Sequence, residues 1–331
     1  MLKAGIIGCG AIFPIHANAI KKLDNAQLVA VCDIDREKAE QAAEKYDCKA
    51  YTDYKEMLAQ ADVVHLCLPH YLHAPVAIDC LKAGKAVLTE KPMAIEYSDA
   101  EAMVKTAEQT GSPLHVIFQN RFNDGSVLVK KLIDDGSLGK VLSARAFVTW
   151  KRQADYYTSS NWKGTWDKEG GGVVINQAIH TLDLMRWLVG SEVKDIAVTM
   201  ANRTIPEIEV EDTAEGMITF ESGVKALFYV TNCYASDAVI QLEVLCENGT
   251  AMLTAADAVV TFKDGRVENS KHKSDENGIE GKGYWGSSHK LQIEDFYNSL
   301  EKGTEVFIPV ADVLKTQKMI CEIYEKGRKT L

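Results

Sequence analysis

The glycine pair in Gly8-Cys9-Gly10 limits the possible folds of this chain more than any other sequence feature. It follows a short apolar run at residues 4–7 and precedes a segment of helical periodicity that extends to Leu23. A glycine turn between a strand and a helix lets the backbone approach a pyrophosphate group, and the amides at the start of the helix then point at the anion. Because the motif stands in this strand-turn-helix context, it predicts a dinucleotide-binding unit near the N-terminus.

Asp33 lies at the end of the next predicted strand, about 20 residues after Phe13, where an acidic side chain accepts hydrogen bonds from the adenine ribose of NAD. A carboxylate there repels the 2′-phosphate of NADP, so we expect NAD in preference to NADP. Phe13 replaces the third glycine or alanine of the motif, which leaves the phosphate-facing glycines unaffected. Arg36 either pairs with a phosphate or opens the next helix as a solvated arginine. The expected nucleotide contacts are Gly8, Gly10, Ala11, Ile12, Asp33 and Arg36.

The first third of the chain alternates short apolar runs with segments of helical periodicity, a pattern typical of a parallel sheet covered by helices. Ala74, Ala77 and Leu81 recur at helical spacing, and Gly84 follows as a helix stop. Right-handed connections then predict an α/β Rossmann domain with a doubly wound parallel sheet at residues 1–120. The predicted strands are residues 4–7, 28–32, 63–68, 86–89 and 114–118.

After residue 120, longer strand-like runs occur with fewer helices between them, which favours antiparallel pairing. We therefore expect a C-terminal α+β domain at residues 121–331, built on a large, mainly antiparallel open sheet, with a late helix able to pack back on the first domain. Polar residues between Phe220 and Val224 predict a hairpin. One face of such a sheet must be covered, so we expect a homodimer or homotetramer to form through it. The predicted strands are residues 142–150, 213–220, 224–230 and 240–246.

Composition restricts the partners of the chain. The 37 basic and 47 acidic residues give a formal net charge of −10, which argues against nucleic acid and anionic lipid as partners. No uninterrupted apolar segment reaches the roughly 18 residues that span a bilayer. The 8 cysteines form no Cys-x-x-Cys pair, and several lie in apolar runs, as is typical of buried thiols in a cytoplasmic protein. No cluster has metal-ligand spacing, so we expect no metal.

The sequence Glu90-Lys91-Pro92 follows the predicted strand at residues 86–89. Ligands of doubly wound sheets bind beyond the carboxyl ends of the strands, which is where Lys91 falls. Neighbours and desolvation can lower the pKa of a lysine there, or the lysine can stay charged and polarise a substrate hydroxyl. The alternative is a solvated lysine that follows a strand. Glu-Lys-Pro at this position resembles the signature of the Gfo/Idh/MocA oxidoreductases, the glucose-fructose oxidoreductase and inositol dehydrogenase type. The resemblance implies that Lys91 is catalytic.

The run from Gly170-Gly171-Gly172 to His180 is similar to a glycine-rich lead into a helix in the same family, where the helix carries an acid or amide and a histidine. Asn176 and His180 are four residues apart, so on one helix they share a face.

A histidine that titrates near neutrality is a candidate general base, and the alternative is a hydrogen-bonded structural histidine. Many polyol-oxidising members have aspartate in place of Asn176, and an amide cannot accept a proton. Proton removal should then depend on His180 and Lys91. Asp183 either orients the His180 imidazole or forms a salt link or cap elsewhere.

Three further segments extend the resemblance over nearly the whole chain: Leu68-Pro69-His70-Tyr71-Leu72-His73, Gln119-Asn120-Arg121-Phe122 and Ser288-His289. The resemblance implies that Pro69 and His73 border the nicotinamide and that Glu90 and Lys91 lie beside the cofactor. It also implies that Arg121 lies near the linker between the domains.

Aromatic residues of the second domain indicate the substrate class. They lie among Ser, Gly, Asn and Lys residues, as sugar-binding platforms do, and the alternative is that they fill the core or a subunit interface. A neutral sugar, glycoside or cyclitol suits this mixture, because a nucleotide sugar needs more cations than Lys151, Arg152 and Lys163. The aromatic residues are Tyr156, Tyr157, Trp162, Trp166 and Trp285. The expected substrate contacts are Lys91, Arg121, Trp162, Asn176 and His180.

These features together predict a dehydrogenase of CH–OH groups. In an interdomain cleft, a hydride would pass between a ring carbinol carbon and the nicotinamide, with His180 handling the hydroxyl proton and Lys91 stabilising alkoxide character. Two alternatives remain open. One is a redox-assisted glycoside-processing enzyme that holds NAD tightly, and the other is a non-catalytic NAD-binding regulator of the same fold.

Overall fold

The computed structural model describes residues 1–270 and 288–331 of the chain. It divides into two compact units. The first unit contains Met1–Gln119 and a later segment that ends at Leu314, and the second begins at Asn120 and includes Lys315–Leu331. Within the described ranges, no helix is both long and apolar enough for a membrane crossing.

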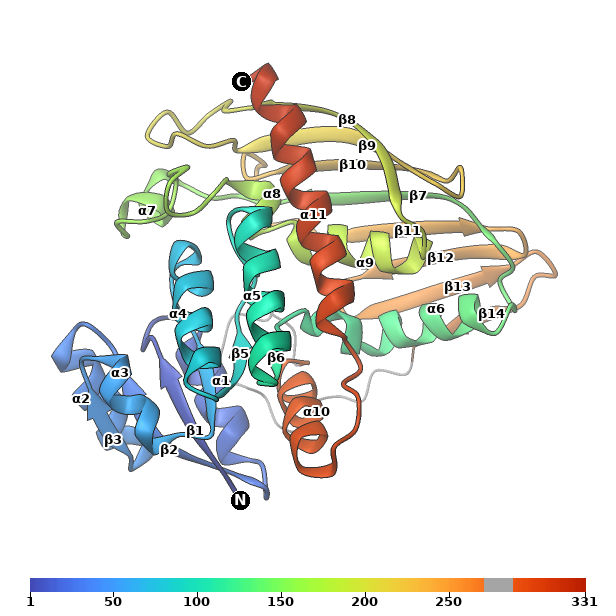
Figure 1. The fold of residues 1–331 in the computed structure, drawn as a ribbon. Coiled ribbons are helices and arrows are strands. Elements are labelled where there is room, and N and C mark those ends of the chain that lie inside the picture. The colour runs from blue at the N-terminus through green and yellow to red at the C-terminus, as the bar shows by residue number, and fades with distance from the viewer. Residues whose placement is uncertain (271–287) are drawn as a thin grey trace. The chain divides into compact units, whose positions relative to one another are not determined.

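The first unit contains a six-stranded sheet in the order β3-β2-β1-β4-β5-β6 (Figure 1). Every ladder in it is parallel. This order reverses direction beside β1, which is the doubly wound Rossmann arrangement, so the predicted fold class is confirmed. The strands are β1 Leu2–Ile7, β2 Ala26–Cys32, β3 Lys49–Tyr51, β4 Val63–Leu66, β5 Ala86–Thr89 and β6 Leu114–Val116.

The sequence prediction missed strand β3. Its three residues, Lys49-Ala50-Tyr51, are exposed or only half-buried and contain no apolar run. Parallel pairing with β2 holds the strand at the sheet edge, where burial on both faces is not required.

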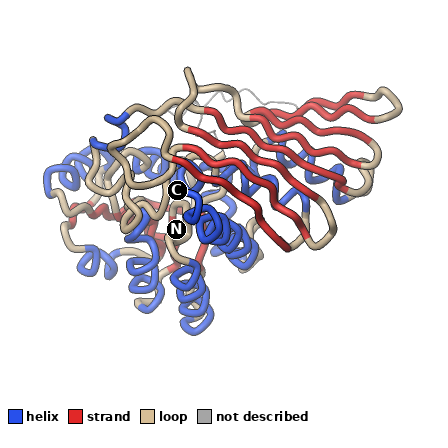
Figure 2. Tube along the Cα trace, turned by 90° about the horizontal axis from the view of Figure 1, so that it is seen from above, coloured by secondary structure: helices blue, strands red, loops and turns tan. Residues whose placement is uncertain are grey.

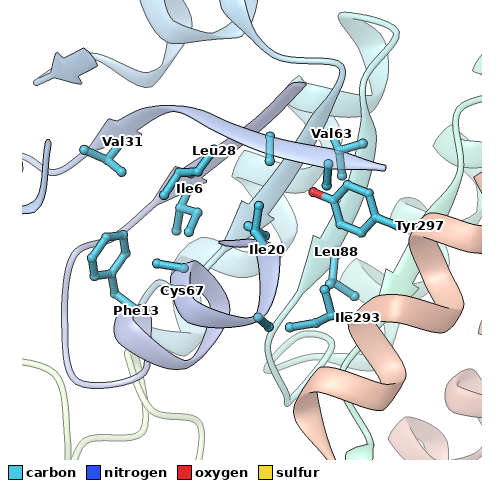
Figure 3. Close-up of a cluster of buried hydrophobic side chains, with 14 of the residues drawn as sticks. Ile6, Phe13, Ile20, Leu28, Val31, Val63, Cys67, Leu88, Ile293 and Tyr297 are labelled. Atoms are coloured by element: carbon cyan, nitrogen blue, oxygen red, sulfur yellow. The ribbon is translucent and has the colours of Figure 1, made fainter. Parts of the chain in front are cut away.

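Helices surround this sheet, and one of them comes from late in the chain. Gly84, at φ +73, follows the predicted helix as expected. Helix α10 returns to the first unit, where its Ile293 and Tyr297 join a core cluster with Ile20 and Leu88 (Figure 3). The helices are α1 Phe13–Lys21, α2 Arg36–Tyr46, α3 Tyr54–Met57, α4 His70–Lys82, α5 Tyr97–Thr110 and α10 His289–Lys302, with a 3-10 turn, η1, at Leu58–Gln60.

The second unit contains an eight-stranded sheet in the order β14-β13-β12-β11-β7-β10-β9-β8, and its strands lie side by side in one twisted layer (Figure 2). The hairpin between β9 and β10 is present, with Gly223 at φ +87 in its turn. The strands are β7 Val141–Thr149, β8 Val193–Ala201, β9 Thr213–Phe220, β10 Lys225–Thr231, β11 Gln241–Cys246, β12 Gly249–Thr254, β13 Asp257–Phe262 and β14 Val267–Asn269.

Antiparallel pairing is confirmed for most of this sheet, with one exception. Strands β7 and β10 run parallel, from Ser143 opposite Lys225 to Thr149 opposite Thr231. The β9–β10 hairpin sets the direction of β10, and its insertion beside β7 then makes this one pair parallel.

Helices α6 and α9 cover one face of the eight-stranded sheet (Figure 1). The opposite face exposes large apolar side chains on neighbouring strands. Across β10, β7, β11, β12 and β13, one cross-strand row contains Leu227, Arg145, Glu243, Met252 and Val259. Leu227 and Val259 are 55% and 45% exposed. The helices are α6 Asp124–Asp134, α7 Ala154–Thr158, α8 Val173–Asn176, α9 Ile179–Val189 and α11 Val310–Gly327, with 3-10 turns η2 at Gln119–Phe122 and η4 at Arg328–Thr330.

Candidate functional site

The two glycines of the N-terminal motif have different steric roles. Gly8 has φ +97, and a Cβ atom there would lie 2.3 Å from the carbonyl oxygen of Cys67. Any larger residue would therefore clash with the backbone of Cys67, which directly follows β4. At Gly10, no described atom lies within 4 Å of the Cβ position, so the loop faces open space there. A tight turn followed by an open backbone surface fits the approach of a pyrophosphate group.

Phe13 explains the departure from the glycine motif. Its ring is buried and packs edge-on against Tyr46 of α2, with 5.4 Å between the ring centroids. Helix α1 is thus anchored by an aromatic contact with α2, where a small residue would instead permit close backbone packing. Pro14 stands in the first turn of α1, where its missing amide leaves no helical bond unmade.

Asp33 is held at the edge of the glycine loop. One carboxylate oxygen accepts the amide of Cys9 at 2.8 Å, and the other accepts the amide of Asp35 at 2.9 Å. The side chain is therefore oriented before any ribose arrives. Arg36 is the first residue of α2, is exposed, and lies 3.7 Å from Glu40 on the same helix, as a solvated arginine would.

His73 connects the loops that follow β4 and β5. It is fully buried, and its ring nitrogens lie 2.6 Å from the carbonyl oxygen of Pro92 and 2.8 Å from that of Leu68. Burial lowers the pKa of His73, although both carbonyl contacts oppose this effect. The imidazole ties the Lys91 loop to the start of α4, where Pro69 is the N-cap residue.

Glu90 directs its side chain into the interior of the first unit. One carboxylate oxygen lies 2.9 Å from Nε2 of His16 and 3.5 Å from Nε2 of His289, and the other accepts the Lys91 amide at 3.2 Å. Burial alone would raise the pKa of Glu90, but the hydrogen bonds and charges of the two histidines hold it well below its ordinary value. The residue before Lys91 is thus a buried, ionised carboxylate.

The glycine run of the second unit is required by close packing. A Cβ atom at Gly171 would lie 2.1 Å from the Tyr324 hydroxyl, and one at Gly172 would lie 1.9 Å from the carbonyl oxygen of Glu211. The Glu211 side chain accepts the amides of Gly172 and Val174 and the Tyr324 hydroxyl proton. Burial nevertheless raises the pKa of Glu211 to about 7.

The expectation that Asn176 and His180 share one helix is wrong. Helix α8 ends at Asn176, and a separate helix, α9, begins at Ile179. The break arises because the amide of Ala178 bonds to the carbonyl oxygen of Val173, five residues back, which widens the turn between the helices.

A carboxylate that the sequence prediction missed lies beside Asn176. The Asn176 amide nitrogen donates to Glu169 at 2.6 Å, and the Glu169 side chain is fully buried. Burial raises the pKa of Glu169 to about 7, against the opposing effect of hydrogen bonds from Gly164 and Asn176. The sequence signal that points to Glu169 is its position directly before the glycine run.

Asp183 forms a salt link and a hydrogen bond. Arg121 donates to its two carboxylate oxygens at 2.8 and 2.5 Å, and Thr316 donates to one of them at 2.6 Å. Arg121 and Asp183 are both 1% exposed. Of the two roles left open by the sequence, the structure therefore supports the salt link. The Arg121 guanidinium is fixed by this pair, and its predicted substrate contact stays a prediction.

The aromatic residues of the second unit divide into two groups. Tyr157 is buried with Ile205, Ile208 and Val210, and Trp166 packs edge-on against Tyr324. Tyr157 therefore fills the core, as the alternative interpretation held, and Trp166, which is partly buried, packs against the same cluster.

Tyr156 belongs to the polar cluster around Asn176. Its hydroxyl accepts from Gln177 at 3.1 Å, and the Lys163 ammonium lies 3.7 Å from its ring centroid. Lys163 also lies 5.9 Å from the ring centroid of Trp162. Trp285 falls outside the described residues.

Comparison with known proteins identifies the family. A family model described as an oxidoreductase family with an NAD-binding Rossmann fold matches residues 2–118, and a model of the GFO/IDH/MocA C-terminal domain matches residues 127–252. The chain belongs to the Gfo/Idh/MocA family. The family resemblance inferred from Glu-Lys-Pro and the glycine-histidine segment is thereby confirmed.

Named family members are dehydrogenases. An inositol 2-dehydrogenase of Salmonella typhimurium is 28% identical over 310 residues, which cover 91% of this chain and 87% of that protein. A 4-carboxy-2-hydroxymuconate-6-semialdehyde dehydrogenase of Sphingobium is 29% identical over 327 residues, 97% of this chain and 98% of that protein. The WlbA dehydrogenase of Bordetella pertussis, solved with NADH and UDP-GlcNAcA, is 30% identical with a TM-score of 0.86 and covers 100% of this chain and 97% of its own.

Proposed function

We propose that this protein is an NAD(H)-dependent dehydrogenase that acts on a ring carbinol of a sugar, glycoside or cyclitol. The observation that carries the proposal is the family membership together with Lys91, which stands in Glu-Lys-Pro directly after β5. The inositol 2-dehydrogenase among the relatives supports a polyol substrate. We assign the cofactor to residues 1–120 and the substrate to residues 121–331.

The first unit offers a fitting surface for NAD. Gly8 and Gly10, with Ala11 and Ile12, would hold the pyrophosphate, because the loop is open at Gly10. Asp33 would accept the adenine-ribose hydroxyls, and its charge is our reason to propose NAD over NADP. Further proposed cofactor contacts are Arg36, Pro69, His73, Glu90 and Lys91.

Two side chains carry the proposed chemistry. Bound NAD would supply the hydride acceptor. In oxidation, the substrate carbon loses its hydride and the hydroxyl loses its proton, which leaves a carbonyl group. His180 accepts that proton, and the Lys91 ammonium stabilises the negative charge that develops on oxygen. Asn176 orients the hydroxyl because an amide cannot take the proton, and Trp162 and Arg121 complete the proposed substrate contacts.

Absorbance at 340 nm tests this proposal. Purified protein would be mixed with NAD and a panel of sugars, glycosides and inositols, and growth of the reduced-nicotinamide band with one substrate would establish the dehydrogenase. A 340 nm band already present without net turnover would favour the redox-assisted enzyme. No absorbance change with any substrate would favour the regulator. Lys91→Ala and His180→Ala should each abolish most turnover and leave NAD affinity nearly intact. Lys82→Ala, at an exposed lysine at the end of α4, should retain turnover.

A nucleotide-linked sugar is the second candidate substrate. It rests on the UDP-GlcNAcA bound by the WlbA dehydrogenase at 30% identity. Lys151, Arg152 and Lys163 would be the cations for a diphosphate. UDP-sugars therefore belong in the same panel, and turnover of a UDP-sugar alone would replace the neutral sugar in our proposal.

We also propose a homodimer or homotetramer formed through the face of the eight-stranded sheet opposite α6 and α9. Phe147, Leu227, Leu245 and Val259 are exposed there, and an apolar sheet face of this kind is stabilised by burial against a second copy. Light scattering should report a multiple of the 36.5 kDa chain mass, and a monomeric mass would refute the proposal.

The eight cysteines, all free thiols, support a cytoplasmic location.

A further inference from the structure

Four side chains form an unbroken hydrogen-bonded line inside the first unit, which we call the histidine relay: Tyr297, His65, His16 and Glu90. The Tyr297 hydroxyl lies 2.9 Å from Nε2 of His65. Nδ1 of His65 lies 2.8 Å from Nδ1 of His16, and Nε2 of His16 lies 2.9 Å from the Glu90 carboxylate. The first three are fully buried and Glu90 is 7% exposed.

The charge state of Glu90 determines which atom donates the hydrogen bond at the carboxylate end of the relay. Glu90 is ionised, because its histidine partners hold its pKa low against the effect of burial. An ionised carboxylate only accepts hydrogen bonds, so Nε2 of His16 must carry a proton. Burial lowers the pKa of His65 well below its ordinary value, so this ring is neutral, with one donor nitrogen and one acceptor nitrogen.

The hydrogen bond of Tyr297 determines which of the remaining ring nitrogens carry protons. If His16 also carried a proton on Nδ1, His65 would have to donate from Nε2 to the Tyr297 oxygen. The hydroxyl proton would then need another acceptor. Across residues 1–270 and 288–331, His65 is the one hydrogen-bond partner of this buried hydroxyl. Leaving the proton unpaired is costly, so Tyr297 donates to His65, His65 donates to His16, and His16 donates to Glu90.

The relay connects elements that serve different parts of the proposed site. His16 lies on α1, directly after the glycine loop, His65 lies on β4 and Tyr297 lies on α10. Glu90 follows β5, and its second carboxylate oxygen accepts the Lys91 amide at 3.2 Å. The backbone at Lys91 is thereby tied, through one carboxylate, to the helix that would receive the pyrophosphate.

We propose that the histidine relay positions Lys91, with Glu90 as the link and with His16, His65 and Tyr297 touching neither substrate nor cofactor. This inference rests on the proposed function of Lys91. The ionised Glu90 accepts hydrogen bonds from His16 and from the Lys91 amide. The His16 donor, which the relay holds in place, in turn keeps Glu90 ionised. Loss of that donor leaves a buried carboxylate that takes up a proton and releases the Lys91 backbone.

The tautomers of the two histidines test the relay independently of turnover. In protein labelled with ¹⁵N at histidine, long-range proton–nitrogen spectra report which ring nitrogen carries the proton. We expect His16 protonated at Nε2 alone and His65 protonated at Nδ1 alone. The signals that disappear in His16→Gln assign His16, and the signals that shift in Tyr297→Phe, where the partner of His65 is removed, assign His65. A doubly protonated His16, or His65 protonated at Nε2, would overturn the inference.

Kinetics test the positioning role. His16→Leu removes the donor, and we expect kcat to fall about 10- to 100-fold, the effect of losing a hydrogen bond to a charged group, with the NADH dissociation constant nearly unchanged. His16→Gln retains one amide donor and one acceptor and should restore most of kcat. His115→Leu is the matched control, since His115 is a fully buried histidine of the same unit outside the relay, and its kcat should stay near the wild-type value.

The pH profile separates positioning from general destabilisation. In His16→Leu the pKa of Glu90 should rise, so kcat should acquire an acid limb and recover as pH increases. Wild type and His16→Gln should lack this limb and show only the acid limb that protonation of the proposed base His180 produces in every variant. The groups that face Glu90 are His16 on α1, His289 on α10, His65 on β4, Cys67 after β4, His73 on α4 and its own neighbour Lys91.

Each outcome decides between the two proposals. Equal kcat in His16→Leu and His115→Leu, or an unchanged pH profile, would overturn the positioning role. If His16→Leu does not fold, Tyr297→Phe removes only the distal hydroxyl and should show the same changes at smaller size, and a wild-type profile would again overturn it. If the wild-type protein turns over no panel member, the proposed function fails, while the tautomers still decide the relay.

Discussion

Replacement of Glu169 by glutamine should change the pH dependence of stability in a calculable way. Burial raises the pKa of this carboxyl from an ordinary value of 4.5 to about 7. Because the folded state holds the proton more tightly than the unfolded state, ionisation destabilises the fold. The penalty is absent below pH 4.5, grows as pH rises, and is complete above pH 7.

The size of the effect follows from these two pKa values. The penalty is about 1 kcal/mol at pH 5 and about 3 kcal/mol at pH 8, from the standard linkage relation. The glutamine variant has no such titration. It loses hydrogen bonding to Asn176 or Gly164 at every pH, which adds only a constant offset. The difference in unfolding free energy, wild type minus variant, should therefore fall by about 2 to 3 kcal/mol between pH 5 and pH 8.

Urea unfolding followed by tryptophan fluorescence is the suitable assay, since all the tryptophans among the described residues lie in the second unit with Glu169. Glu221→Gln, at an exposed carboxylate in the β9–β10 turn, is the matched control and should give a difference that does not change with pH. A wild-type minus Glu169→Gln difference that stays constant, or that rises with pH, would refute the reasoning.

Three further predictions concern packing, the buried ion pair and the cofactor. Gly171→Ala places a methyl group 2.1 Å from the Tyr324 hydroxyl and should destabilise the second unit by about 3 kcal/mol, seen as a lower urea midpoint. Asp183→Ala leaves the buried Arg121 guanidinium without its carboxylate and should cost about 3–5 kcal/mol, so a loss below about 1 kcal/mol would contradict the buried pair. Asp33→Asn removes the charge that opposes a 2′-phosphate, and the ratio of kcat/KM for NAD over NADP should fall about tenfold. An unchanged ratio in steady-state assays would remove Asp33 from cofactor selection.

The sequence predicted the first unit well because its signals are local. Strand and helix alternation, the stop at Gly84 and the glycine turn at Gly8 each depend on a few adjacent residues with specific backbone needs. The same holds for the β9–β10 hairpin with Gly223 in its turn. Strand β3 was missed because its three residues carry no apolar pattern and pair only at an edge.

The candidate site was predicted less completely. Contiguous motifs located Lys91 and His180, but no local pattern identified Glu169 as the partner of Asn176. Helical spacing placed Asn176 and His180 on one helix, whereas a wide turn at Ala178 separates two helices. Periodicity describes regular helices and does not register a break made by a single displaced hydrogen bond.

The sequence alone determined the family, the order of the Rossmann elements and the residues that stand in its motifs, because each depends on neighbours along the chain. Only the tertiary structure decided which buried polar groups pair. Asp183 pairs with Arg121, 62 positions away in the chain, and His65 forms a hydrogen bond with Tyr297, 232 positions away. A buried charge or imidazole must find a partner wherever the packed core presents one, and that choice depends on the whole fold.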